Sequence, residues 1–186
     1  VGKSSPEVLS KIYQIWSNHD DPLFDEHDYM EMAYRLAIMR PDEWQQILDR
    51  ERQRLGTDLL RQEFDYVCRG CTPDSRAQRD LFNGLLRPEN RRQEPWALHL
   101  LALLNADVRE QVSNVYISSS LSSLDYLHQT SDIFFCTDWL MTLLSERKSP
   151  EARRLVERHL KEHPDMMPQL KNKILEASWM LMNNRL

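Results

Sequence analysis

One segment near the carboxyl end has the residue types and spacing of a metal site. His159, Glu162 and His163 match H-x-x-E-H, which on a helix places two imidazoles one turn apart, where they can bind Zn²⁺ while the glutamate acts as a base. Pro164 follows directly and stops a helix, and basic side chains are common in a last turn because they complement its negative end. The setting favours an accidental match, so we expect no metal ligand and no catalytic residue in this chain.

Two shorter motifs are weaker. Cys68 and Cys71 form a lone C-x-x-C at the end of a predicted helix. A structural zinc site needs two further ligands at matching spacing. A redox-active C-x-x-C stands at the start of a helix, where the helix dipole lowers the thiol pKa. The pattern favours two unlinked thiols. Gly2, Lys3 and Ser4 resemble the tail of a phosphate-binding loop, but no alternation of strands and helices follows, so we expect that match to be accidental.

The remaining candidate for chemistry is a basic loop. Asn90, Arg91 and Arg92 precede an apolar predicted helix, and two adjacent guanidiniums on an anchored loop can hold a carboxylate in a bidentate manner. The alternative is a pair that is solvated or satisfied by helix carbonyls and nearby acids. We take Arg91, Arg92 and Asn90 as the candidate substrate contacts.

The elements that position these residues are predicted to be helices. Proline stands at five places where a helix can begin, often after Ser or Thr and before an acid, which suits the first turn of a helix. Between these sites apolar residues recur at helical spacing, as in Tyr29, Met32, Ala33, Leu36 and Ala37. We predict helices over residues 6–18, 26–39, 41–55, 58–69, 73–86, 95–104, 107–113, 119–130, 137–146, 150–162 and 168–183.

These short helices predict an all-α fold in a single helical domain, 1–186. Pro6, Pro41 and Pro73 are separated by 35 and 32 residues, which favours paired helices stacked in a HEAT-like or armadillo-like superhelix of about eleven helices. An irregular helical bundle is the alternative. The segment 96–104 is apolar nearly all round and is expected to be covered on both sides. Three aromatics, Phe134, Phe135 and Trp139, are expected to anchor the neighbouring helices.

Composition excludes several classes of partner. The 186 residues carry a formal net charge of −5 without a basic stripe, so we expect no nucleic-acid partner. No apolar run approaches the ~18 residues of a membrane helix, and no membrane span is expected. Three cysteines argue against a disulfide scaffold. The sequence begins at Val1 without a signal-peptide pattern, which favours a piece of a longer protein. The compartment is unknown.

Several segments, in order along the chain, resemble a known family. They are Asn90-Arg91-Arg92, Glu94-Pro95-Trp96, Ser113 to Ile117, and the stretch from Asp132 to Leu175, which contains Ile133-Phe134-Phe135 and Trp139. Together they resemble the C-terminal helical domain of aminopeptidase N-like zinc metallopeptidases. The similarity runs from about Tyr29 to the end. Two positions depart from the family pattern: Cys136 replaces a frequent proline, so Thr137 is expected to cap the next helix, and Asn105-Ala106-Asp107 replaces Asn-His-Pro.

The resemblance implies a HEAT-like domain that covers the catalytic domain of the same polypeptide and limits the entry of peptide substrates. The catalytic H-E-x-x-H of that family is absent from these residues, so this chain alone is not expected to be an enzyme or to hold a cofactor, and zinc would belong to the parent's catalytic domain. One alternative is a free-standing α-helical repeat module for protein–protein interaction. A third reading is a small zinc hydrolase that uses His159, Glu162 and His163.

Overall fold

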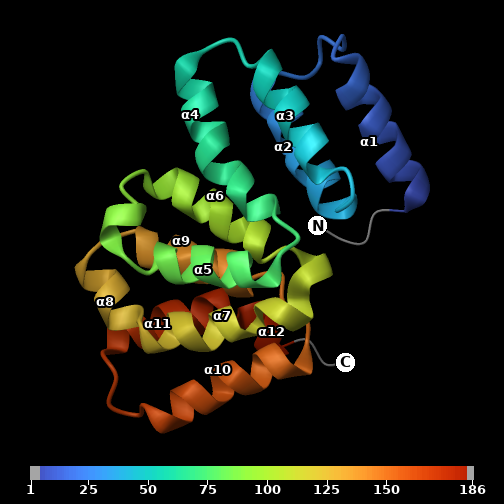
Figure 1. The fold of residues 1–186 in the computed structure, drawn as a ribbon. Helices are drawn as coiled ribbons and strands as arrows, with labels where there is room; N and C mark the ends of the chain where they lie inside the picture. Colours follow the sequence, from blue (N-terminus) through green and yellow to red (C-terminus); the bar gives the residue numbers. More distant parts are fainter. Residues whose placement is uncertain (1–4, 184–186) are drawn as a thin grey trace. The chain divides into compact units, whose positions relative to one another are not determined.

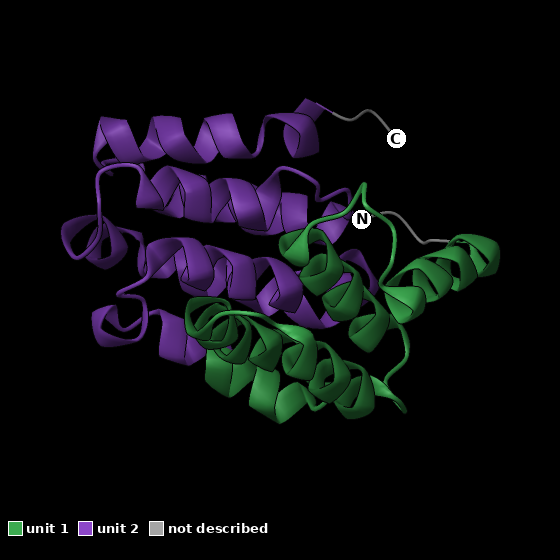
Figure 2. Ribbon diagram, turned by 90° about the horizontal axis from the view of Figure 1, so that it is seen from above, with its two compact units in different colours: residues 1–81 green, residues 82–186 purple. Residues whose placement is uncertain are grey.

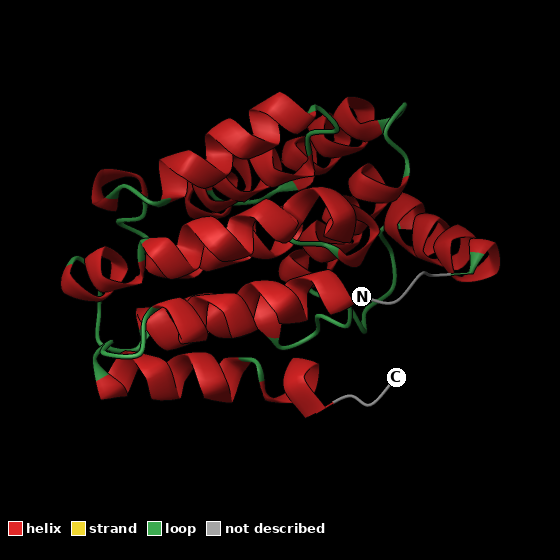
Figure 3. Cartoon of the chain, turned by 90° about the horizontal axis from the view of Figure 1, so that it is seen from below, coloured by secondary structure: helices red, strands yellow, loops and turns green. Residues whose placement is uncertain are grey.

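The structure is a computed structural model that describes residues 5–183 (Figure 1). This part of the chain forms twelve α-helices and three short 3-10 helices, and it contains no strand (Figure 3). The prediction of an all-α fold is therefore confirmed. The chain divides into two compact units, Val1–Leu81 and Phe82–Leu186 (Figure 2), and a single domain over 1–186 stays a prediction. Within residues 5–183, no helix is both long and apolar enough to cross a membrane.

The first unit is centred on its second helix, α2, which packs against α1 on one side and α3 on another. Its core includes Tyr34 and Phe64, whose rings stack with centroids 5.2 Å apart. The last helix of this part of the chain is α5, and the boundary between the two units falls within it, after Leu81. The bounds are α1 (Pro6–Asn18), α2 (Glu26–Met39), α3 (Trp44–Arg54), α4 (Asp58–Val67), η1 (Cys68–Cys71) and α5 (Ser75–Leu85).

The second unit is built around α9, which packs against α6, α7 and α11, while α7 also packs against α10. Apolar residues of α6 are buried at Ala97, Leu100, Leu101, Leu103 and Leu104, as expected for segment 96–104. The bounds are η2 (Pro88–Asn90), α6 (Glu94–Leu104), η3 (Asp107–Arg109), α7 (Glu110–Ser122), α8 (Leu124–Gln129), α9 (Phe135–Leu144), α10 (Pro150–Glu162), α11 (Pro168–Ala177) and α12 (Trp179–Asn183).

The proline-based helix starts are confirmed where a serine precedes the proline. The Ser149 hydroxyl accepts a hydrogen bond from the Ala152 amide at 3.2 Å, which satisfies one donor that the first turn leaves unpaired. At Pro73 the prediction was two residues early. The Asp74 carboxylate, not Thr72, accepts from the Arg76 amide at 2.7 Å, so α5 begins at Ser75.

The predicted break between the helices 107–113 and 119–130 was wrong, because residues 114–118 are helical. One helix, α7, runs through the serine-rich segment instead, and α8 follows it. Ser120 is fully buried, and its hydroxyl accepts a hydrogen bond from the Trp139 indole at 2.9 Å. A partner from α9 thus satisfies this buried hydroxyl, so Ser120 does not compete with the backbone hydrogen bonds of α7.

The prediction that three aromatic residues anchor the neighbouring helices was partly wrong. Phe135 is 2% exposed and Trp139 is buried, but the Phe134 side chain is 69% exposed. The expected cap at Thr137 was also wrong, because α9 begins at Phe135 and the Thr137 hydroxyl instead accepts from Lys173 Nζ at 2.5 Å.

Near the end of the chain, the predicted helix 168–183 is interrupted at Ser178, whose hydroxyl donates to the Ile174 carbonyl at 2.7 Å.

Candidate functional site

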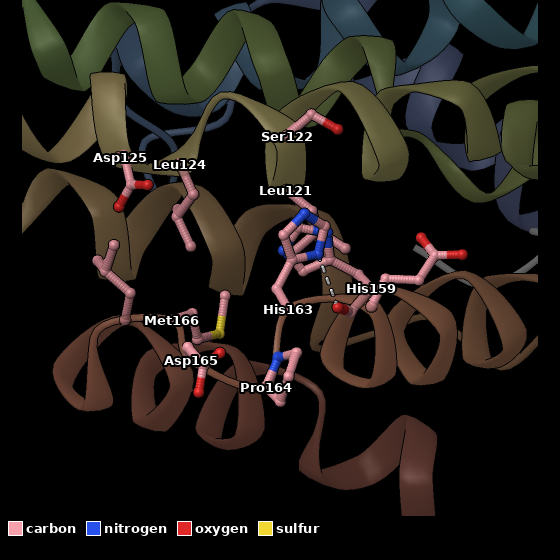
Figure 4. A pocket seen from close by; sticks show the side chains of 11 residues that line it. Leu121, Ser122, Leu124, Asp125, His159, His163, Pro164, Asp165 and Met166 are labelled. Atoms are coloured by element: carbon pink, nitrogen blue, oxygen red, sulfur yellow. Dashed lines mark hydrogen bonds between the residues drawn. The ribbon is translucent and has the colours of Figure 1, made fainter.

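A pocket in the second unit brings the H-x-x-E-H segment together with the α7–α8 junction (Figure 4). Its volume is about 410 Å³, which lies within the range of roughly 300–1,000 Å³ for small-molecule sites. Apolar side chains and three carboxylates line it beside the two imidazoles: Leu121, Leu124, Met166 and Leu170, with Asp125, Glu162 and Asp165.

Local signals at both ends of α10 position the histidines. Ser149 caps the start of the helix and Pro150 occupies its first position. At the other end, the His163 amide donates to the His159 carbonyl at 3.1 Å. Pro164 follows directly and has no amide to extend the helix. The helix therefore ends at the pocket, with His159 in its last turn and His163 as its carboxyl-terminal cap.

The two imidazoles are stacked on one another. Their ring centroids are 4.3 Å apart and their planes differ by 29°. His163 Nδ1 lies 2.9 Å from the His159 carbonyl oxygen. Since that oxygen can only accept, Nδ1 of His163 carries a proton. Nε2 of His159 is buried without a hydrogen-bond partner among the described residues. Figure 4 shows the two rings close together, with Pro164, Asp165 and Met166 nearby.

The surroundings of His159 favour the neutral form of its imidazole. Burial is the largest cause that lowers its pKa, and the neighbouring His163 lowers it further. Glu162 and Asp125 act in the opposite direction with smaller effect. A neutral imidazole is compatible with the unpaired Nε2, because a protonated ring would place a buried N–H donor there without an acceptor.

The geometry does not assemble a metal site. Among residues 5–183 no group of three His, Cys, Asp or Glu side chains is arranged to hold a metal ion. A zinc site needs at least three protein ligands that point to a common centre, and no third ligand joins the two stacked rings among the described residues. The pocket is instead an open recess lined by apolar side chains and carboxylates.

Of the candidate substrate contacts, Arg91 is engaged inside the second unit. Its side chain is 2% exposed. Nε donates to the Ser131 hydroxyl at 3.1 Å, Nη2 donates to the Thr130 hydroxyl at 2.5 Å, and the guanidinium lies 5.4 Å from the centroid of the Phe135 ring. Burial lowers the pKa of Arg91. The guanidinium thus holds the turn before α9.

The structure does not bring the three candidate residues together around one cavity. Asn90 and Arg92 are exposed. The Asn90 amide donates to the Gly84 carbonyl at 3.0 Å, which ties η2 to the end of α5. A role of Asn90, Arg91 and Arg92 in substrate contact stays a prediction, and Arg92 is the member whose side chain faces solvent.

Sequence reasoning missed the other half of the pocket. Leu121, Leu124 and Asp125 lie more than thirty residues before His159, and no local pattern announces that these segments meet. Arg147 was missed as well: it is 5% exposed and donates to Asn105 and Ser113. A basic residue between two predicted helices gave no sign of burial.

The other two motifs do not contribute to a site. Cys68 and Cys71 are free thiols, and burial raises the pKa of Cys68 to about 11, so its reactive thiolate form is disfavoured. Gly2, Lys3 and Ser4 lie outside the described residues.

Compared with known proteins, the chain matches no family model, and no curated protein or solved structure is significantly similar to it.

Proposed function

We propose that this chain is the non-catalytic C-terminal helical domain of a zinc-dependent aminopeptidase. In this proposal it covers the chamber of the catalytic domain of the same polypeptide and controls access of peptides. Zinc and the reacting groups belong to that catalytic domain, and the chain described here supplies no catalytic residue.

The observation that carries the proposal is the contact between two segments in which the resemblance is most specific. The Asp132 amide donates to the Glu94 carboxylate at 3.0 Å, and Arg91 donates to Thr130 and Ser131. Residues 90–96 and 130–135 therefore depend on one another for their hydrogen bonds. Such dependence is expected of two segments that together build one fold.

We further propose a HEAT-like stacking of the helices. Within the second unit, α6 packs against α9, α9 against α11 and α7 against α10. These pairs are two or three helices apart in chain order, which is the separation expected between neighbouring helix pairs in a stack.

The function predicts a role for Arg92 in the complete polypeptide. Its exposed guanidinium holds the C-terminal carboxylate of a short peptide, a contact worth roughly 1.5–3 kcal/mol for a charged hydrogen bond. Arg92→Ala should lower kcat/KM on a tripeptide by about 10- to 150-fold. An aminoacyl anilide lacks the carboxylate and should be hydrolysed at an unchanged rate.

Arg87→Ala provides the matched control, because Arg87 is also exposed and lies in the same connection. It should affect neither substrate. Equal losses on both substrates in Arg92→Ala would indicate damaged folding, and no loss on either would remove Arg92 from the site.

A second candidate function is a helical module that binds another protein. Phe134 and Trp179 favour it, because they are 69% and 64% exposed, and large exposed aromatics are common in protein-binding surfaces. In a complete polypeptide that holds no zinc and cleaves no peptide, this second function would replace the first.

A further inference from the structure

The first helix is attached to its unit by one deeply buried side chain. Trp16 is the buried residue of α1 and is 1% exposed. Tyr13 makes a more peripheral contact, with the Arg40 guanidinium 4.4 Å from its ring centroid. Because burial of large apolar side chains dominates helix docking, the position of Trp16 determines whether α1 stays on α2 and α3.

Trp16 is held by a buried carboxyl group on α3. The Trp16 indole donates to Glu51 Oε2 at 2.7 Å, and Glu51 is fully buried. The second oxygen, Oε1, is also buried and accepts no hydrogen bond among the described residues. A carboxylate in this setting has lost the water that would stabilise its charge and has recovered only part of that stabilisation.

Two arginines of α3 hold the end of α1 beside this contact. Arg54 donates to the Trp16 and Ser17 carbonyls at 2.7 and 3.0 Å, and Arg50 donates to the Ser17 carbonyl at 2.9 Å. Both guanidiniums also lie about 5 Å from the Trp16 ring. These bonds satisfy carbonyls that the last turn of α1 leaves unpaired.

The charged groups around Glu51 come from α2 and α3, and Arg54 Nη1 lies 3.7 Å from Glu51 Oε2. Burial is the largest cause that raises the pKa of Glu51, and Glu26 of α2 raises it further. The Trp16 hydrogen bond and the charges of Arg54 and Arg50 lower it by less. At the end of α1, the His19 ring lies against Tyr29 in a tilted arrangement with centroids 3.8 Å apart, and burial followed by Arg54 lowers the pKa of His19.

We propose that α1 is a detachable strap, and that ionisation of Glu51 beneath Trp16 loosens it. Detachment of α1 returns Glu51 to water, where a glutamic acid titrates near its ordinary pKa of about 4.3. The docked state binds a proton more tightly than the detached state. Docking is therefore strongest below about pH 4.3 and weakens as the pH rises through the raised pKa of docked Glu51. This device is independent of the proposed aminopeptidase role.

His19 acts in the opposite direction, so the test is made in a His19→Asn background. Its pKa is lowered in the docked state, and docking would gain strength as the pH rises toward 6.5. Asparagine removes this titration and tolerates the left-handed backbone of residue 19, whose φ is 54°.

The experiment is amide hydrogen exchange of this chain between pH 4.5 and 8, with rates corrected for the intrinsic effect of pH and α2 as internal reference. In His19→Asn, protection of α1 relative to α2 should fall as the pH rises, by about 10-fold for each unit by which docking raises the Glu51 pKa. Adding Glu51→Gln keeps an oxygen acceptor for Trp16 and should abolish this dependence.

Asp65→Asn is the matched control, since Asp65 is a half-exposed carboxylate of the same unit that pairs with Arg52 at 2.6 Å. It should leave the pH dependence of α1 intact. Protection of α1 that does not change with pH in His19→Asn would overturn the proposal even if Glu51→Gln fails to fold. Retention of the dependence in Glu51→Gln would overturn it too.

Discussion

At the scale of single residues, two adjacent phenylalanines have opposite surroundings. Phe135 is 2% exposed and lies against Trp139, with ring centroids 5.6 Å apart, whereas Phe134 is 69% exposed. Phe135→Ala should lower the free energy of unfolding by about 3–5 kcal/mol, because it removes a buried ring and leaves a cavity. Phe134→Ala should change it by less than about 0.5 kcal/mol.

Urea denaturation of both variants measures the difference, and each serves as the other's control. Equal midpoints for the two variants would contradict the burial of Phe135 and the exposure of Phe134.

His159 predicts a specific titration. The unfolded chain takes up a proton on this imidazole near pH 6.5, while burial lowers the pKa in the folded chain. Folding therefore disfavours the proton, so the stability contributed by neutral His159 is present above about pH 6.5 and is lost as the pH falls through the folded pKa. NMR of the imidazole should give a midpoint below 6.5. A midpoint at or above that value would contradict the buried, stacked arrangement.

At the scale of elements, Arg147 joins three helices of the second unit. It donates to Asn105 after α6, to the Glu110 carbonyl of α7 at 3.3 Å and to the Leu143 carbonyl of α9 at 3.4 Å. Arg147→Met should lower the free energy of unfolding by at least about 2 kcal/mol, because it leaves several buried acceptors unpaired.

Arg154→Met is the control for this prediction. The ion pair of Arg154 with Glu151 joins exposed side chains, so its loss should lower the free energy of unfolding by much less than the loss of Arg147 does. A comparable loss in both variants would mean that Arg147 is not the junction between α6, α7 and α9.

The sequence predicted those elements whose boundaries are set by local chemistry. Ser149 and Pro150 predicted the start of α10, and Pro164 predicted its end. The apolar spacing predicted α2. The break predicted at residues 114–118 was wrong, because the burial of Tyr116 and Ile117 within the second unit is a tertiary effect that no local pattern shows. Only one side of the pocket could be predicted from the sequence, because His159 and His163 form a recognisable motif. The stacking of their rings and the opposite wall at Leu121 depend on tertiary packing.

At the scale of the whole molecule, the helical architecture of residues 5–183 is one that many proteins share. It is compatible with an aminopeptidase domain and with a free-standing module. The distinguishing chemistry, zinc and cleavage of an N-terminal residue, is assigned by the proposal to another domain of the polypeptide.

The most direct measurement compares zinc content and aminopeptidase activity in the complete polypeptide and in this chain alone. We predict one zinc per complete polypeptide, release of N-terminal residues from peptides, and neither property in the isolated chain. A complete polypeptide without zinc and without activity would contradict the proposed function. So would one tightly held zinc in the isolated chain that is lost in His159→Ala, which would favour the small zinc hydrolase.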